Sequence, residues 1–209
     1  MAAIVLSLGL ILTAYLLGSI PWGLVLTRWV AAEDIRTRGS GNIGATNVVR
    51  VAGKAIGALT LVLDMLKGGL PVYWALGVID HIPHAWGEML VAVVALSAFF
   101  GHLFPLFLRF KTGGKGVATA FGCFLAIVPI ACGCAMAVFC LMVWRFHYVS
   151  AGSLAASLTL PVFIAFWGNS NWLIFAAVVM AVSIFIRHAA NIKRLLRGTE
   201  PVFGTSLKK

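Results

Sequence analysis

Charged residues are scarce in this chain, and acidic residues are the scarcest of all. Aspartate, glutamate, lysine and arginine together make up 11% of the 209 residues, whereas 61% are hydrophobic. The mean hydropathy is +1.01. A soluble domain is about one quarter charged and about half apolar. This composition excludes an ordinary soluble domain and indicates an integral membrane protein.

Only six acidic residues stand against sixteen basic ones, which gives a net charge of +10. In a soluble protein this balance would suggest nucleic acid as a partner. In a membrane protein the positive-inside rule explains it, because lysine and arginine collect in cytoplasmic loops. We therefore expect no nucleic-acid partner. A basic surface also attracts anionic substrates and lipid headgroups, and this interpretation is compatible with the first.

Metal-binding and disulfide patterns are missing. The cysteines form no CxxC pair and lie in apolar sequence, where they are interpreted as packing residues: Cys123, Cys132, Cys134 and Cys140. With no cluster of zinc ligands, we expect no metal and no cofactor. The N-terminal apolar run is long and has no basic segment ahead of it, which predicts a first transmembrane helix rather than a signal peptide.

Common catalytic motifs are also missing. The chain has no HxxxxD acyltransferase motif and no GxSxG nucleophile elbow. An enzyme with this sequence would need a substrate that is already activated. Its site would mainly bind and position that substrate.

Long apolar runs predict an all-α fold of transmembrane helices, at about 4–26, 55–79, 89–108, 149–167 and 172–186. Residues 117–143 suit one span by length, but one span would place the basic segment 187–198 outside. Two short helices that turn near Pro129 and Gly133 keep that segment inside. We therefore predict a single polytopic domain, 1–209, with seven transmembrane helices. Two short ones lie in 114–144, the N-terminus is outside and the C-terminus inside.

Three polar segments then face the cytoplasm, 36–50, 101–119 and 187–200, and they can converge on one site. In the first, glycines free successive backbone N–H groups to face an anion. Arg50 can bind a phosphate with two parallel hydrogen bonds. The neutral hydrogen-bonding groups beside it are Ser40, Asn42, Thr46 and Asn47. An ordinary cytoplasmic loop with a helix cap is the alternative.

The second segment contains "FKTGGKGVAT", which is not a Walker A motif because Gly116, rather than serine or threonine, follows Lys115. Flexible N–H groups, the lysines Lys111 and Lys115, and the start of a helix nevertheless favour an anion. A glycine-rich turn with positive-inside charges is the alternative. His102, just upstream, suits a structural interfacial histidine equally well.

In the third segment, His188 and Asn191 share a helix face, and the alternative is a basic amphipathic helix on the headgroups. Within the predicted helix 55–79, Asp64 and Lys67 are intramembrane charges, which often mark function. Their i,i+3 spacing lets the pair neutralise itself. A structural pair and a substrate contact are equally compatible with the sequence.

The three segments together resemble the motifs of the bacterial acyl-phosphate:glycerol-3-phosphate acyltransferases, membrane enzymes that begin phospholipid synthesis. The family motif S-G-N-x-G-A-T-N-x-x-R is matched from Ser40 to Arg50. G-H-x-x-P followed by F-K/R-G-G-K-G-V-A-T is matched over 101–119, except that Thr112 is inserted and can shift Lys111 relative to Lys115. The third motif, H-x-x-N-I-x-R-L-x-x-G-x-E, is matched over 188–200.

This resemblance implies acyl transfer from acyl phosphate to the 1-hydroxyl of glycerol 3-phosphate, which yields lysophosphatidic acid and phosphate. We expect direct transfer without a covalent acyl-enzyme, on the cytoplasmic side of the bacterial inner membrane. Catalytic roles are expected for Ser40, His188 and Asn191, with either His188 or the substrate phosphate accepting the proton. Substrate or phosphate binding is expected of Gly41, Asn42, Thr46, Asn47, Arg50, His102, Lys111, Gly113, Gly114, Lys115, Gly116 and Arg194.

A transporter of an organic phosphate or another anion is the competing prediction. It would explain the basic groups, but it predicts access from both sides, and the predicted outer loop 80–88 has no lysine or arginine. A structural membrane subunit would leave the glycine- and asparagine-rich motifs without a purpose. The sequence makes no prediction about oligomeric state.

Overall fold

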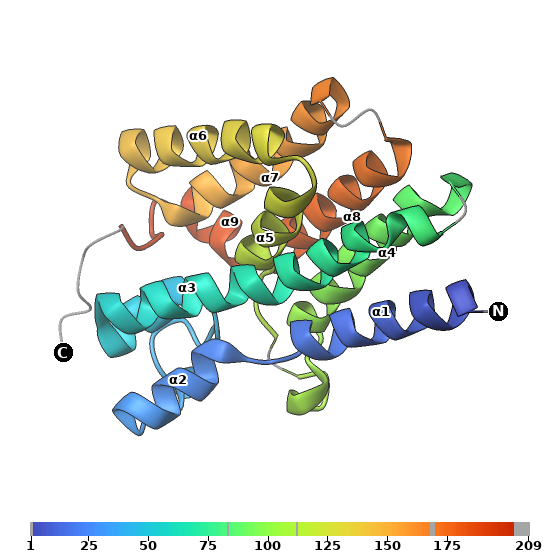
Figure 1. Ribbon diagram of the computed structural model, residues 1–209. Helices are drawn as coiled ribbons and strands as arrows, with labels where there is room; N and C mark the ends of the chain where they lie inside the picture. The colour runs from blue at the N-terminus through green and yellow to red at the C-terminus, as the bar shows by residue number, and fades with distance from the viewer. Residues whose placement is uncertain (1, 83, 112, 168–169, 203–209) are drawn as a thin grey trace.

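The apolar runs fold into a bundle of helices (Figure 1). The computed structural model describes residues 2–82, 84–111, 113–167 and 170–202, and these ranges contain helices and no strand. The α-helices are α1 (Ala2–Gly18), α2 (Trp22–Ala31), α3 (Ala45–Gly77), α4 (His84–Leu103), α5 (Val117–Ile127), α6 (Pro129–Phe146), α7 (Val149–Trp167), α8 (Asn171–Arg187) and α9 (Ala189–Leu196). Short 3-10 helices are η1 (Ile35–Thr37), η2 (Ile79–His81) and η3 (Leu106–Leu108).

Several helical stretches are long and apolar enough to cross a membrane. The described part of the chain contains four such stretches: Ala2–Ala31, Trp86–Leu108, Pro129–Phe146 and Val149–Trp167. The bent pair α8 and α9, which meet at 60°, makes a fifth if it counts as one span. Large apolar side chains point outward, as in lipid. Ile4 is 66% exposed and Leu158 is 62% exposed. The prediction of an all-α integral membrane fold is confirmed.

The first apolar run is broken, although we predicted one continuous helix over about 4–26. α1 ends at Gly18 and α2 begins at Trp22. Pro21 lies in the break, where its missing N–H cannot continue the helical ladder. At the break the Ile20 carbonyl accepts from the Trp22 N–H at 3.1 Å rather than from the next helical turn, and Lys67 Nζ also donates to it at 2.8 Å. An intramembrane lysine therefore satisfies the backbone at this break.

α3 bends sharply inside the segment that we predicted as a loop up to residue 54. The helix already begins at Ala45, and Gly53 then adopts φ +87° and ψ 173°. Gly57 folds back so far that a Cβ there would lie 3.0 Å from the Val49 backbone nitrogen. Residues eight apart in a straight helix are about 12 Å apart. A separate helical turn therefore precedes the long part of α3, and it carries Thr46, Asn47 and Arg50.

Residues 117–143 form two helices, as predicted, and the break at Val128 lies directly before Pro129. α5 ends at Ile127 and α6 begins at Pro129, so Gly133 lies within α6. α5 has only 11 residues and packs on α3. It lies near the centre of the view in Figure 1. A Cβ at Gly68 of α3 would overlap the Thr119 carbonyl oxygen of α5, so this contact fixes the start of α5 closely.

Small residues also bring α1 and α4 together. A Cβ at Gly18 would overlap the Ala98 carbonyl, and one at Gly101 would overlap the Tyr15 carbonyl. Such close backbone contacts are typical of packed membrane helices. They set the end of α4 beside the α1–α2 break. The loop that leads into α5 crosses the bundle at this end.

Candidate functional site

The centre of the candidate site is a chain of hydrogen bonds between the second and third polar segments. Lys115, just before α5, donates from Nζ to Asn191 Oδ1 at 2.6 Å. Asn191, on α9, donates from Nδ2 to Glu200 Oε1 at 2.6 Å. The oxygen and the NH₂ group of the Asn191 side-chain amide are therefore both engaged. The orientation of the Asn191 amide is fixed because one neighbour is a donor and the other an acceptor.

Glu200 is the hub of this network. Its Oε1 also accepts from Ser150 Oγ at 2.7 Å, and its Oε2 accepts from Arg194 Nε at 2.7 Å. Burial alone would raise the pKa of Glu200, but the hydrogen bonds from Asn191, Ser150 and Arg194 lower it overall. The carboxylate is therefore ionised at neutral pH. Ser150 was not among the predicted residues, and the sequence does not single it out, because α7 also carries Ser153 and Ser157.

Arg187, at the end of α8, holds the segment 113–116, which we call the glycine loop. Its Nε donates to the Gly114 carbonyl at 3.0 Å, and its Nη2 donates to the Gly113 carbonyl. The Gly114 N–H donates to the His102 carbonyl at 3.2 Å. We had expected the amides of this loop to face phosphate, but the Gly114 amide is already engaged at the end of α4.

Gly116 ends the loop in a conformation that suits glycine. Its φ is +85°, and a Cβ there would overlap the Phe99 ring. It caps the first turn of α5. Contacts of its backbone therefore fix the loop in place, and the Lys115 side chain is the group of the loop that extends into the site.

The electrostatics of Lys115 bring the three segments together. Burial, together with the charges of Arg194, Arg50 and Arg187 and against the opposing charge of Glu200, lowers the pKa of Lys115 to about 8. Within the described residues, no carboxylate lies within ion-pair distance of Lys115 or Arg50. Four cations thus surround a single carboxylate. Such a surplus of positive charge suits an anion.

Other arginines of the first segment are neutralised locally. Arg36 lies 2.6 Å from Asp34, Arg28 lies 2.9 Å from the same carboxylate, and Arg38 lies 2.9 Å from Glu33. These exposed pairs leave Arg50 as the arginine of the segment 36–50 whose charge reaches the site.

Asn47 shapes the first segment from inside. Its Oδ1 accepts from the Ser40 N–H at 2.9 Å, and its Nδ2 donates to the carbonyls of Arg38 at 3.1 Å and Asn42 at 2.9 Å. The side chain is buried. We had expected Asn47 to contact substrate, but its amide is already engaged in holding the loop. Asn42 accepts from the Gly44 N–H at 2.8 Å, which further tightens the turn.

Four other predicted residues lie at the surface of the loops. The Ser40 side chain is exposed, Gly41 adopts φ +71°, and Thr46 is half-buried in the first turn of α3. Lys111 is exposed in the turn after η3. The predicted effect of Thr112 on Lys111 concerns a residue outside the described ones.

His188 lies at the junction of α8 and α9, outside the membrane-spanning part of α8, and it is buried. Its Nδ1 lies 2.9 Å from the Ile184 carbonyl, so the neutral ring donates there and keeps a lone pair on Nε2. Burial, together with the charge of Lys115, lowers the pKa of His188 to about 4. His188 is thus a neutral and weak base at pH 7.

His102 lies behind the glycine loop rather than in front of it. A Cβ at Gly114 would overlap the His102 Nε2 atom, and the ring is buried. The structure therefore places this predicted binding residue in contact with the backbone of the loop, on the side away from solvent.

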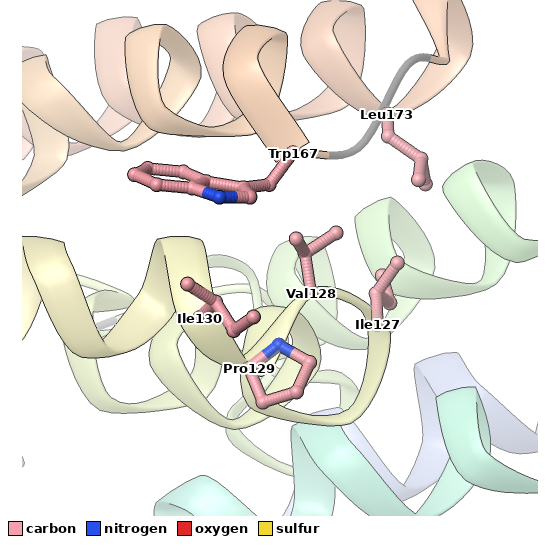
Figure 2. A pocket seen from close by; sticks show the side chains of 6 residues that line it. All are labelled: Ile127, Val128, Pro129, Ile130, Trp167 and Leu173. Atoms are coloured by element: carbon pink, nitrogen blue, oxygen red, sulfur yellow. The ribbon is translucent and has the colours of Figure 1, made fainter.

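Two mostly apolar crevices lie in other parts of the structure. One of about 300 Å³ lies at the turn between α5 and α6 and faces α7 and α8 (Figure 2); it is lined by Ile127, Val128, Pro129, Ile130, Trp167 and Leu173. The other, of about 420 Å³, lies beside α2 and is lined by Ile20, Pro21, Leu24, Val25, Arg28, Trp29, Phe107 and Leu108. Neither is lined by Lys115 or Asn191.

Comparison with known proteins finds close relatives over nearly the whole chain. Residues 8–198 match the family described as glycerol-3-phosphate acyltransferase. The glycerol-3-phosphate acyltransferase of Syntrophotalea carbinolica is 49% identical, and covers 93% of this chain and 96% of its own. The glycerol-3-phosphate acyltransferase of Trichlorobacter lovleyi is 50% identical, and the match covers 91% of this chain and 94% of that protein.

Solved structures agree with these relatives. The crystal structure of PlsY, an integral membrane glycerol 3-phosphate acyltransferase, in its glycerol 3-phosphate form, has a TM-score of 0.87 and 38% identity, with 95% of this chain and 96% of that chain covered. The lysophosphatidic acid form has a TM-score of 0.84 at 37% identity. The likeness therefore includes sequence and fold together.

Proposed function

Because this chain belongs to the glycerol-3-phosphate acyltransferase family, we propose that it transfers a fatty acyl group from acyl phosphate to the 1-hydroxyl of glycerol 3-phosphate. The products are lysophosphatidic acid and inorganic phosphate. The observation that carries the donor assignment is the cationic cluster around Lys115, with Arg50, Arg187 and Arg194. Two phosphate-bearing substrates need such a site, and an acyl phosphate is already activated.

The proposed reaction is a single displacement. The 1-hydroxyl oxygen forms a bond to the acyl carbon, and the bond from that carbon to the phosphate oxygen breaks. Negative charge accumulates on the departing phosphate, where Lys115 and Arg50 stabilise it. Asn191 and Glu200 orient Lys115 through the hydrogen-bond chain. The catalytic role expected for Asn191 thus becomes, in this proposal, one of positioning the lysine.

The departing phosphate accepts the hydroxyl proton in this scheme. His188 is a poor candidate because its pKa is lowered to about 4 by burial and by the charge of Lys115. A proton on Nε2 would add a further positive charge beside the cationic cluster. We assign His188 to orienting a substrate group with its Nε2 lone pair, and we assign proton acceptance to the substrate.

We place the site on the cytoplasmic side of the bacterial inner membrane, with the N-terminus outside and the C-terminus inside. In this topology, every lysine and arginine among the described residues except Lys67 falls in a stretch assigned to the cytoplasmic side. Seven crossings result if α1 and α2 form one span and each of α3 to α8 forms another. α5 is short for a span, but its packing on α3 shields it.

The crevice beside α2 is the surface that we propose for the acyl chain. It begins at Ile20, whose carbonyl binds Lys67 below the glycine loop, and it continues along apolar side chains of α2. The crevice at the other end of α5 is apolar and has no cation among its lining residues (Figure 2). It thus offers no anion entry of the kind that a transporter would need.

Direct transfer is tested by omitting the acceptor. Purified protein in lipid is incubated with palmitoyl phosphate and labelled inorganic phosphate, without glycerol 3-phosphate. We expect no exchange of label into palmitoyl phosphate and no acylated Ser40 by mass spectrometry, because within the described residues the hydrogen bond of Ser40 is made by its backbone N–H and none joins its hydroxyl to a base. Label exchange together with an acylated peptide would establish a covalent intermediate instead.

We predict that kcat/KM for glycerol 3-phosphate falls above about pH 8. Lys115 carries its proton below its pKa of about 8 and loses it above, so binding of phosphate weakens by about tenfold per pH unit on the alkaline side. Initial rates from pH 6 to pH 10, corrected for spontaneous hydrolysis of the donor, measure this limb. The variant Lys115→Arg should lack it, since arginine stays charged throughout that range.

We predict that His188→Gln lowers kcat by about tenfold or less, and that His188→Ala lowers it several-fold more. Glutamine retains an acceptor oxygen for orienting substrate but cannot take up a proton at neutral pH. Single-turnover rates with saturating substrates separate this effect from binding. Equal and complete loss in both variants, in folded protein, would mean that the imidazole itself accepts the proton.

A further inference from the structure

A cluster of buried charges that the proposed mechanism does not use lies directly behind the glycine loop. Asp64 is 2% exposed, Lys67 is 3% and His102 is 4%. Lys67 Nζ lies 2.8 Å from Asp64 Oδ1, so the pair neutralises itself as the i,i+3 spacing predicts. The same carboxylate oxygen lies 3.8 Å from His102 Nδ1. We call these three residues the buried triad.

The buried triad touches the glycine loop through one ring. The His102 Nε2 atom occupies the space that a Cβ of Gly114 would need. The His102 carbonyl accepts from the Gly114 N–H, and a Cβ at Gly113 would overlap the Leu103 carbonyl. The end of α4 is therefore a floor against which both glycines are pressed.

Arg187 closes the loop from the opposite side. It donates to the carbonyls of Gly113 and Gly114, so the loop is held between the guanidinium and the imidazole. Lys115 follows directly in sequence. Its Nζ reaches Asn191 at 2.6 Å only if the loop keeps its position.

The other end of the buried triad is tied to the α1–α2 break. Lys67 Nζ donates to the Ile20 carbonyl at 2.8 Å. α1, α3 and α4 thus meet at one ion pair beneath the loop. A buried ion pair is seldom a net source of stability, because apolar residues of similar size do as well. In the described part of the chain, His102 Nδ1 also has no hydrogen-bond partner, and a buried group of this kind calls for an explanation.

We propose that Asp64, Lys67 and His102 are positioning residues, in which the ion pair holds the His102 ring and the ring sets the position of the glycine loop and thus of Lys115. This proposal rests on the proposed function, since it concerns how that site holds its phosphate-binding lysine. None of the three residues contacts substrate. The sequence left two roles open for Asp64 and Lys67, a structural pair or a substrate contact. In this proposal the pair instead acts on the site through the glycine loop.

The first test is a double-mutant cycle between His102 and Gly114. We expect Gly114→Ala to lower kcat/KM for glycerol 3-phosphate by about 100-fold, because the added methyl group pushes the loop off the ring. His102→Ala alone should lower it by about tenfold. In the double variant the methyl group enters the space of the lost ring, so activity should recover at least about tenfold over Gly114→Ala. Losses that simply multiply would overturn the proposal.

Gly133→Ala is the matched control for this cycle. A Cβ at Gly133 meets no atom within 4 Å, and the residue lies inside α6, far along the chain from the loop. We expect its activity and melting temperature to stay near those of the wild type. A loss comparable to that of Gly114→Ala would show that glycine replacement in any helix disturbs this protein, and would also overturn the proposal.

The second test asks whether the ion pair acts on Lys115. In the double variant Asp64→Asn/Lys67→Met, a loosened loop should expose Lys115 to water. The alkaline limb of kcat/KM, set by Lys115 among Glu200, Arg194, Arg50 and Arg187, should then move upward by about one pH unit. A purely structural pair would lower the melting temperature and leave the limb in place. If this variant does not fold, the cycle between His102 and Gly114 decides alone.

Wild-type protein assayed with palmitoyl phosphate separates the two proposals. Wild-type turnover together with multiplying losses in the cycle would reject only the positioning role. No turnover in the wild type would reject the proposed function itself. We expect wild-type turnover, recovery in the double variant of the cycle, and a raised alkaline limb when the ion pair is removed.

Discussion

Replacing Lys115 with methionine should lower kcat/KM for acyl transfer by about 1,000-fold. The change removes the one ammonium group that the glycine loop presents, and leaves Asn191 without its donor. Methionine keeps the length and the apolar stem of the lysine, so packing is little altered. Steady-state rates with labelled glycerol 3-phosphate, together with a melting curve, separate lost chemistry from lost folding.

The matched control for that variant is Lys193→Met. Lys193 lies on α9, two residues from Asn191, but it is exposed and donates no hydrogen bond to the network in the described structure. We expect its kcat/KM to stay within about twofold of wild type, since a single surface charge contributes little. If the two lysine variants lose activity equally, the effect of Lys115 would come from general surface charge, and the assigned role would be wrong.

Replacing Glu200 with glutamine should also cost about 1,000-fold in kcat/KM. Glutamine brings an NH₂ group where the network needs an acceptor. If that group faces Arg194, two donors meet; if it faces Asn191, the Asn191 amide must turn and present its own donor to Lys115. No arrangement satisfies Asn191 and Arg194 together. The cluster of cations also loses Glu200, the one carboxylate whose charge acts on Lys115 within the described residues.

Ser150→Ala is the graded control for the Glu200 variant. It removes one of three hydrogen bonds to Glu200 and leaves the charge in place. We expect a loss of about threefold to tenfold, in line with one ordinary hydrogen bond. If Ser150→Ala lost nearly all activity while the Glu200 variant stayed active, the hydroxyl group on α7 would matter more than the carboxylate. That result would contradict the hub role of Glu200.

The membrane fold was predictable because apolar runs report burial in lipid directly. The division of 117–143 into α5 and α6 was also predictable, since only that division kept 187–198 with the other basic segments. The break at Pro21 was missed because proline is tolerated in membrane helices when another group satisfies the freed carbonyl. That group is Lys67, 47 residues away along the chain.

Motif spacing predicted only part of the candidate site: neither Glu200 nor Arg187 was given a role, and the directions of the side chains were not predictable. Motif spacing marks Asn47 and Asn191 as polar and important, yet Asn47 turns into its own loop while Asn191 turns toward Lys115. The bend at Gly53 and the angle between α8 and α9 decide this. Both depend on tertiary packing. Ser150 was missed for the same reason, since only the fold brings it to Glu200.

The central claim is that the cationic site takes an acyl phosphate as donor, and one assay tests it most directly. Purified protein in lipid receives labelled glycerol 3-phosphate with either palmitoyl phosphate or palmitoyl-CoA. We predict labelled lysophosphatidic acid with palmitoyl phosphate only, and its near absence in Lys115→Met. Product from palmitoyl-CoA alone would contradict the account, because the donor would then carry no acyl phosphate group for Lys115 and Arg50 to bind.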